Sequence, residues 1–146
     1  MKVALLDVNV LLALAWPNHQ HHASAHEWFA RENRHGWATC ALTQLSFVRL
    51  SSNPAYTPAA VTPSEAGQLL RKLAAHRTHR YWATMPQPER AMFAHALGHR
   101  QVQDAYMVHL AEQQRGRLVT FDRRVIVHAT DAGSVHVISG EAGLGS

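Results

Sequence analysis

The sequence predicts a single α/β domain in which a central, mostly parallel sheet is flanked by helices. Two observations support this prediction. Short apolar runs alternate along the chain with longer amphipathic segments, as they do in proteins built from successive β-α units. The chain has 146 residues, about the length of one ordinary domain, and 47% of them are hydrophobic, which is enough to form a buried core.

Five short segments, most of them apolar, are predicted to form the strands. The first covers residues 2–6 and ends at Asp7, and the others cover 37–40, 80–83, 117–120 and 135–138. Cys40, the only cysteine in the sequence, ends the second of these segments and is expected to be a buried thiol. A disulfide within the chain is therefore excluded, and a cytoplasmic location is expected.

Capping residues mark the starts of several predicted helices. Asn9 is expected to cap a short apolar helix over residues 10–15, since asparagine is a favoured N-cap. Thr62 opens a capping box followed by proline, a strong helix start. Thr43 is expected to cap a helix over residues 44–51. The remaining helical segments are predicted at 22–33, 63–76, 101–115 and, as a short helix with a loop, within 86–98.

The predicted elements occupy the chain without a linker or a repeat. We therefore assign residues 1–138 to one domain and residues 139–146 to a C-terminal tail. No apolar run approaches the roughly 20 residues that a membrane span needs, and the first residues lack a signal-peptide cleavage site. We expect no association with a membrane.

The balance of charge favours a polyanionic partner. The formal net charge is +4, the pI is about 9.8, and all basic residues except Lys2 and Lys72 are arginines. The planar guanidinium group suits phosphate better than the point charge of lysine does. An arginine-rich composition inherited from a GC-rich genome is an equally good explanation.

Three histidines close in sequence, His19, His21 and His22, resemble a metal cluster at first sight. They lie between a Trp-Pro break and the start of an amphipathic helix, and no cysteine or carboxylate joins them at ligand spacing. A solvated loop and helix start is the favoured interpretation.

Three of the ten acidic residues occupy positions that converge in the predicted fold. Asp7 ends the first buried strand, and Asp122 lies just beyond the strand at 117–120. Asp104 lies in the first turn of the helix that precedes this strand. Strands of an open parallel sheet all end at one edge, where ligands bind, and the start of that helix should face the same edge.

Each of these aspartates alone has an ordinary structural explanation, either as an N-cap or as a complement to a helix dipole. Together they repel one another unless a cation neutralises them. Mg²⁺ and Mn²⁺ favour such oxygen ligands and activate water against phosphodiesters. A carboxylate cluster on an arginine-rich protein therefore indicates a phosphodiesterase.

Four motifs in the right order resemble the PIN domain, and more narrowly the VapC-type toxins of type II toxin–antitoxin systems. They are Leu5 to Ala13, Gln103-Asp104-Ala105-Tyr106, Leu118 to Asp122, and Trp37 to Leu50 with Asn53-Pro54 after it. The resemblance covers the chain from Met1 to about Ile138. It implies an endoribonuclease dependent on Mg²⁺ or Mn²⁺, usually a homodimer, held inactive by a cognate VapB-type antitoxin.

The resemblance places the family's metal-binding aspartates on Asp7, Asp104 and Asp122, and its second polar residue on Asn9 as a supporting residue or N-cap. The family commonly has a glutamate where this chain has Gln44. The loss of one negative charge favours a single metal over two. Gln44 could still offer its carbonyl oxygen or orient a metal-bound water.

The leading hypothesis is an endoribonuclease toxin whose candidate catalytic residues are Asp7, Gln44, Asp104 and Asp122. Arg49 and Arg100 are candidates for contacts with the RNA backbone. The alternative is a catalytically weak RNA- or antitoxin-binding module in which Gln44 has disabled hydrolysis. A metal-dependent nuclease that cuts DNA is the third possibility.

Overall fold

The five predicted apolar segments form one sheet in the computed structural model, which describes residues 2–139. The strands lie in the order β3-β2-β1-β4-β5, and all four neighbouring pairs are parallel. Their bounds are β1 Ala4–Leu6, β2 Trp37–Cys40, β3 His79–Trp82, β4 Arg117–Thr120 and β5 Val135–Val137. The prediction of an α/β domain with a mostly parallel sheet is confirmed.

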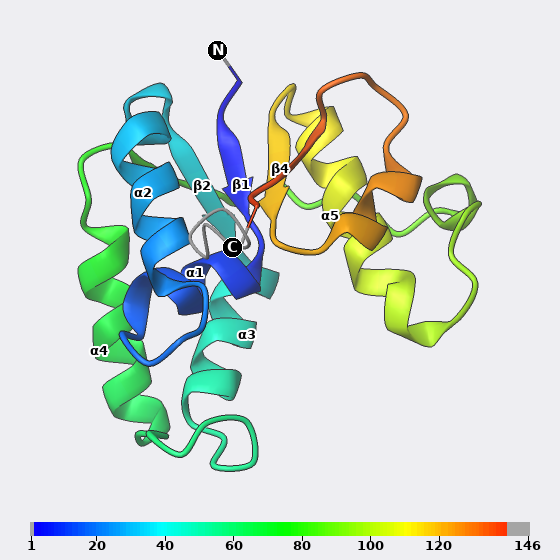
Figure 1. Cartoon of the computed structure of the whole chain (residues 1–146). Helices are drawn as coiled ribbons and strands as arrows, with labels where there is room; N and C mark the ends of the chain where they lie inside the picture. Colours follow the sequence, from blue (N-terminus) through cyan, green and yellow to red (C-terminus); the bar gives the residue numbers. More distant parts are fainter. Residues whose placement is uncertain (1, 140–146) are drawn as a thin grey trace.

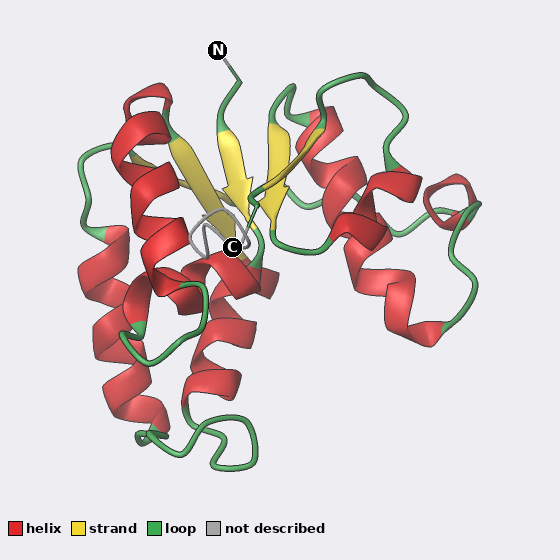
Figure 2. Cartoon of the chain, viewed as in Figure 1, coloured by secondary structure: helices red, strands yellow, loops and turns green. Residues whose placement is uncertain are grey.

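Helices cover both faces of this sheet (Figures 1 and 2). In Figure 1, α1 to α4 lie on one side of the strands and α5 lies on the other. The α-helices are α1 Val8–Ala15, α2 His22–Glu32, α3 Ala41–Ser51, α4 Pro63–Ala74 and α5 Val102–Gln113. The 3₁₀ helices are η1 Asn33–His35, η2 Arg90–Phe93, η3 His99–Gln101 and η4 Arg123–His128.

Successive residues of the central strand point into two separate cores. Leu6 packs with the side chains of α1 to α4, including Phe47, whereas Leu5 packs with Met107 and Leu110 of α5. A sheet covered on both faces needs strands that are apolar at every position, because side chains alternate between the faces. This requirement explains why residues 4–6 form an uninterrupted apolar run and are all buried.

Two helices begin earlier than their predicted caps. Helix α1 starts at Val8, and its N-cap is Asp7, whose carboxylate accepts from the Val8 N–H, so the prediction that Asn9 caps this helix is wrong. Helix α3 starts at Ala41, so the prediction of Thr43 as its cap is also wrong. The Thr43 hydroxyl instead accepts from the Cys40 N–H. The capping box at Thr62 and Glu65 is present as predicted.

The carboxyl edge of the sheet gathers the ends of β1 and β4. Leu6 is paired in register with Val119, and the Asp7 N–H donates to the Val119 carbonyl oxygen at 2.9 Å. Asp7 thus lies beside Thr120, although the two residues are far apart in sequence. Within residues 2–139 no helix is long and apolar enough to cross a membrane. Of the predicted tail, residues 140–146 lie outside the described part of the chain.

Candidate active site

Asp7 is fixed at the junction of β1 and α1 by contacts to both of its carboxylate oxygens. Its Oδ1 accepts from the Val8 N–H at 2.8 Å, and its Oδ2 accepts from the Thr120 hydroxyl at 2.8 Å. Burial raises the pKa of Asp7, these two hydrogen bonds oppose the rise, and the charge of Asp122 adds to it. The site thus holds a carboxylate in a place that disfavours its negative charge.

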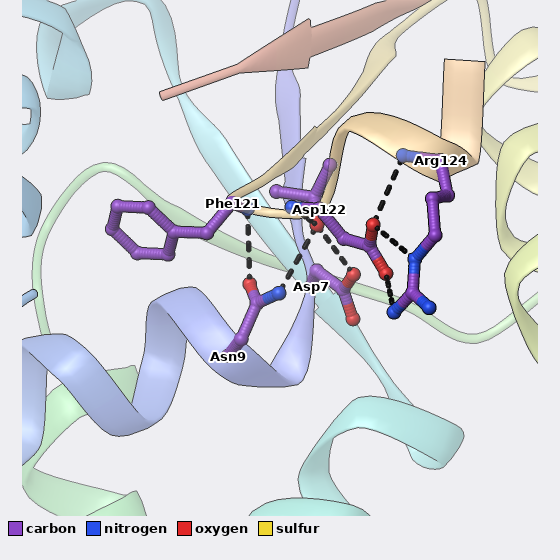
Figure 3. Close-up of polar contacts among 6 residues, drawn as sticks. Asp7, Asn9, Phe121, Asp122 and Arg124 are labelled. Carbon is purple, nitrogen blue, oxygen red and sulfur yellow. Dashed lines mark hydrogen bonds and ion pairs between the residues drawn. The ribbon is translucent and has the colours of Figure 1, made fainter. Parts of the chain in front are cut away.

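The Thr120 hydroxyl connects three parts of the site. It donates to Asp7, and it accepts from the Asn9 side-chain amide at 3.1 Å and from the Asp122 N–H at 3.1 Å. A hydroxyl has one donor and two acceptor positions, so this fully buried group uses all of them. Asn9 also accepts from the Phe121 N–H at 3.4 Å (Figure 3). Asn9 therefore supports the site from within α1.

Asp122 follows β4, caps η4 and is paired with a nearby arginine. Its Oδ1 accepts from the N–H and the Nε of Arg124 at 2.9 and 3.0 Å, and its Oδ2 accepts from Nη2 at 2.9 Å (Figure 3). The Arg124 guanidinium lowers the pKa of Asp122, an effect that outweighs partial burial. Asp122 is the neutralised member of the three aspartates.

Asp104 lies in the first turn of α5, half-buried beside the other two aspartates. Burial raises its pKa from 3.8 to about 6, with further contributions from the negative charges of Asp7 and Asp122 that outweigh the opposing charge of Arg124. No side chain of residues 2–139 donates a hydrogen bond to its carboxylate. The structure thus brings the three predicted aspartates within range of mutual repulsion, as the parallel topology implied.

A pocket of about 240 Å³ opens between the start of α5 and η4. Polar and charged side chains line it: Arg100, Gln101, Asp104, Asp122, Arg124 and His128. Two of the three aspartates thus face this pocket, and Asp7 is not among its lining residues.

Comparison with known proteins decides the family. The PIN domain family model matches residues 4–131. Ribonuclease VapC38 of Mycobacterium tuberculosis is 44% identical over 127 residues, which cover 87% of this chain and 90% of that protein. Ribonuclease VapC39 of the same species is 39% identical over 141 residues, which cover 92% and 99%. The chain belongs to the VapC family of PIN-domain proteins.

A solved structure supports the fold of this VapC-family chain. The crystal structure of PAE2754 from Pyrobaculum aerophilum has a TM-score of 0.61 and covers 92% of this chain and 83% of its own. The sequence identity is 23%, so this likeness concerns the fold alone. The family membership predicted from the sequence motifs is confirmed.

Gln44, the position at which this VapC-family chain departs from the expected glutamate, has hydrogen-bond partners on other elements. Its Nε2 donates to the Thr39 hydroxyl at 2.9 Å, and its Oε1 accepts from Arg71 of α4 at 3.5 Å. The Thr39 hydroxyl also bonds with the His79 ring at 2.8 Å. Within residues 2–139, Gln44 makes no hydrogen bond with any of the three aspartates.

The donor set at the VapC site suits a hard divalent cation in its chemistry. Asp7 and Asp104 present carboxylate oxygens at a place where burial and mutual repulsion disfavour charge, which is where such an ion stabilises most. The Arg124 guanidinium competes with such an ion for the Asp122 carboxylate. Accordingly, no group of three His, Cys, Asp or Glu side chains among residues 2–139 is already arranged as a metal site.

The histidine cluster has a structural role at the end of α1. The rings of His22 and His26 lie within 2.7 and 2.8 Å of the carbonyl oxygens of Ala13 and Leu14, which are otherwise free at a helix end. His21 stacks on Phe121 with ring centroids 4.5 Å apart. The favoured interpretation of this segment as a loop and helix start agrees with the structure.

Three residues near the site were missed by the sequence reasoning. Thr120 ends β4 and Arg124 lies in η4, each two residues from Asp122, a spacing that could have pointed to both. His128 has no such signal, because only the path of η4 brings it to the pocket.

Proposed function

We propose that this chain is a metal-dependent endoribonuclease, the toxin of a type II toxin–antitoxin system. The observation that carries the proposal is the meeting of three aspartates at the carboxyl edge of the sheet, with the pKa of Asp104 raised to about 6. A cluster in which, among the described residues, only Asp122 is paired with a cation is costly unless a further cation joins it. The relatives are named ribonucleases and match nearly the whole chain.

Mg²⁺ or Mn²⁺ is the proposed cofactor, with Asp7 and Asp104 as its main ligands. A bound ion of this type would supply a water of lowered pKa and positive charge for the phosphodiester. Thr120 keeps the Asp7 carboxylate in one orientation, and Asn9 and the Asp122 N–H keep Thr120 in place. Asp122 completes the set of ligands or positions the attacking water, and Gln44 orients water or phosphate.

The proposed partners are an RNA substrate, a cognate VapB-type antitoxin and a second copy of the chain. Large apolar side chains remain exposed in the described structure, among them Leu45, Leu97 and Val102, and a homodimer could cover some of them. Light scattering should then report twice the chain mass of 16.3 kDa. The proposed compartment is the cytoplasm, since Cys40 is a buried free thiol.

Replacement of Asp7 by asparagine tests the catalytic assignment. Asp7→Asn keeps the size of the side chain and one acceptor oxygen, but it removes the charge that would bind the metal. We expect RNA cleavage in Mn²⁺ to be lost while the fold is retained. Asp131→Asn is the matched control, because Asp131 is exposed and lies beside Glu112 near the opposite end of α5.

The same assay separates the alternatives. A binding module would retain RNA without cleaving it in either Mn²⁺ or EDTA. A nuclease directed at DNA would be inhibited more strongly by competing DNA than by competing RNA. Wild-type cleavage rates in Asp7→Asn, with contaminating nuclease excluded, would show that the assigned centre is wrong.

A further inference from the structure

The pocket beside the aspartates has two chemically different sides. Asp104 and Asp122 form the acidic side, which the proposed function assigns to the metal and the scissile phosphate. Arg100 and His128 lie among the other lining residues and have no part in that assignment. These two residues provide the evidence for an additional site.

His128 is a buried polar side chain without a partner. Its exposed fraction is 2%, and neither ring nitrogen has a hydrogen-bond partner among residues 2–139. Its Nδ1 is fully enclosed, so the Nε2 edge of the ring is the one that can reach the pocket. The buried atom left unsatisfied is Nδ1, which the protein encloses, whereas Nε2 has no partner in the described part of the chain and is free to bond with a ligand in the pocket.

The surroundings of His128 favour a neutral imidazole. Burial lowers the pKa of His128, and the nearby rings of His95 and His109 lower it further. A neutral ring can donate or accept one hydrogen bond at its free edge, which matches a hydroxyl group. A phosphate would be matched better by the charged ring, which this environment opposes.

Arg100 is the cationic group available at the same pocket. Its side chain is exposed, and it forms no ion pair within residues 2–139, whereas Arg124 is engaged with Asp122. A guanidinium group at a pocket rim binds phosphate oxygens well. A group suited to phosphate, Arg100, and a group suited to a hydroxyl, His128, thus line the same pocket as the two carboxylates.

We propose that this pocket binds the nucleotide next to the scissile bond, with Arg100 contacting its phosphate and His128 hydrogen-bonding the 2′-hydroxyl of its ribose. The inference rests on the proposed function, because it takes RNA as the substrate. It goes further by assigning the preference for ribose over deoxyribose to one buried side chain, since the 2′-hydroxyl distinguishes RNA from DNA.

Binding without cleavage tests the phosphate contact. Fluorescence anisotropy in EDTA, with a labelled 12-nucleotide RNA of mixed sequence, gives affinities across a series of salt concentrations. For single strands, each lost phosphate contact reduces the slope of log affinity against log salt by about 0.7. We expect this reduction in Arg100→Gln. Arg77→Gln is the matched control, because Arg77 is exposed. It precedes β3 and so lies at the amino ends of the strands, away from the carboxyl edge that carries the aspartates.

The hydroxyl contact is tested by comparing RNA with DNA of the same mixed sequence. We expect His128→Gln to reduce the ratio of RNA to DNA affinity several-fold while leaving the salt slope unchanged. Because the substitution is at a buried position, the wild-type protein supplies a second measurement. The ring signals of His128 in NMR spectra should shift more with ribonucleoside 5′-monophosphates than with their deoxy counterparts or inorganic phosphate.

The inference would be overturned by equal salt slopes in Arg100→Gln and wild type. It would equally be overturned by His128 signals that respond alike to ribose, deoxyribose and inorganic phosphate. All of these measurements are made in EDTA, so a failure to cleave RNA would contradict the proposed function and leave them unaffected. Conversely, if the wild-type protein cleaves RNA but shows none of these differences, the proposed function stands and the assignment of this pocket to nucleotide binding is wrong.

Discussion

Asp104→Asn should make the metal-free protein more stable at neutral pH. The fold disfavours the ionised form of Asp104, whose pKa is raised from 3.8 to about 6. A rise of this size corresponds to at most about 3 kcal/mol. Because the side chain is partly exposed to solvent, we expect a gain of about 1–2 kcal/mol in the free energy of unfolding.

The sign of the effect depends on pH in a defined way. A carboxyl group with a raised pKa favours folding while it holds its proton, and this contribution is lost as the pH rises from about 4 through about 6. The advantage of Asp104→Asn should therefore be largest above pH 7 and small near pH 4. A saturating divalent ion should reduce or reverse it, because the ion stabilises the folded wild type.

Urea unfolding in EDTA at pH 7.5 and pH 4 measures this effect. Asp131→Asn serves as the control for removing an exposed carboxylate and should change little at either pH. If Asp104→Asn were less stable than wild type at pH 7.5, repulsion among the aspartates would not be the source of its shifted pKa. A difference of the same size at both pH values would contradict the reasoning equally.

Three further changes test other contacts. Arg124→Gln should tighten Mn²⁺ binding in a calorimetric titration, because Asp122 loses its competing cation; unchanged affinity would contradict this. Burial raises the pKa of Glu112, but its bonds from Ser134 and Thr130 outweigh this and lower it. Glu112→Gln should thus cost about 1 kcal/mol at pH 7 in urea unfolding, a loss that disappears as the pH falls below about 4. Gln44→Glu should tighten Mn²⁺ binding about tenfold, or about 1.4 kcal/mol, if Gln44 lines the site, whereas equal affinity would place it outside.

The fold was predictable because its signals are local. The central strand β1 is an uninterrupted apolar run, and the capping box at Thr62 fixes the start of α4 without help from distant residues. Helix α1 shows the limit of such signals. Asn9 is a good cap by type, but Asp7 takes the position because the backbone turns at the end of β1, and Asn9 is used by Thr120 instead.

The position of the three aspartates followed from topology, whereas their individual states did not. A parallel sheet places Asp7 and Asp122 at one edge whatever their neighbours are. That Asp122 is paired and Asp104 is not depends on the side-chain path of Arg124, which no periodicity encodes. His128 was missed for a similar reason, since its place at the pocket depends on the path of η4 after the cap at Asp122.

The way in which Asp7 is held has a consequence for the choice of ion. Hydrogen bonds from α1 and β4 fix both of its oxygens, so the carboxylate cannot rotate or retreat without breaking one of them. Mg²⁺ needs oxygen ligands at about 2.0–2.1 Å, whereas Ca²⁺ prefers about 2.3–2.6 Å and a flexible, more crowded shell. A ligand that cannot adjust favours the smaller ion. We therefore expect Ca²⁺ to be a poor substitute, discriminated against by the stiffness of one side chain rather than by the number of charges around it.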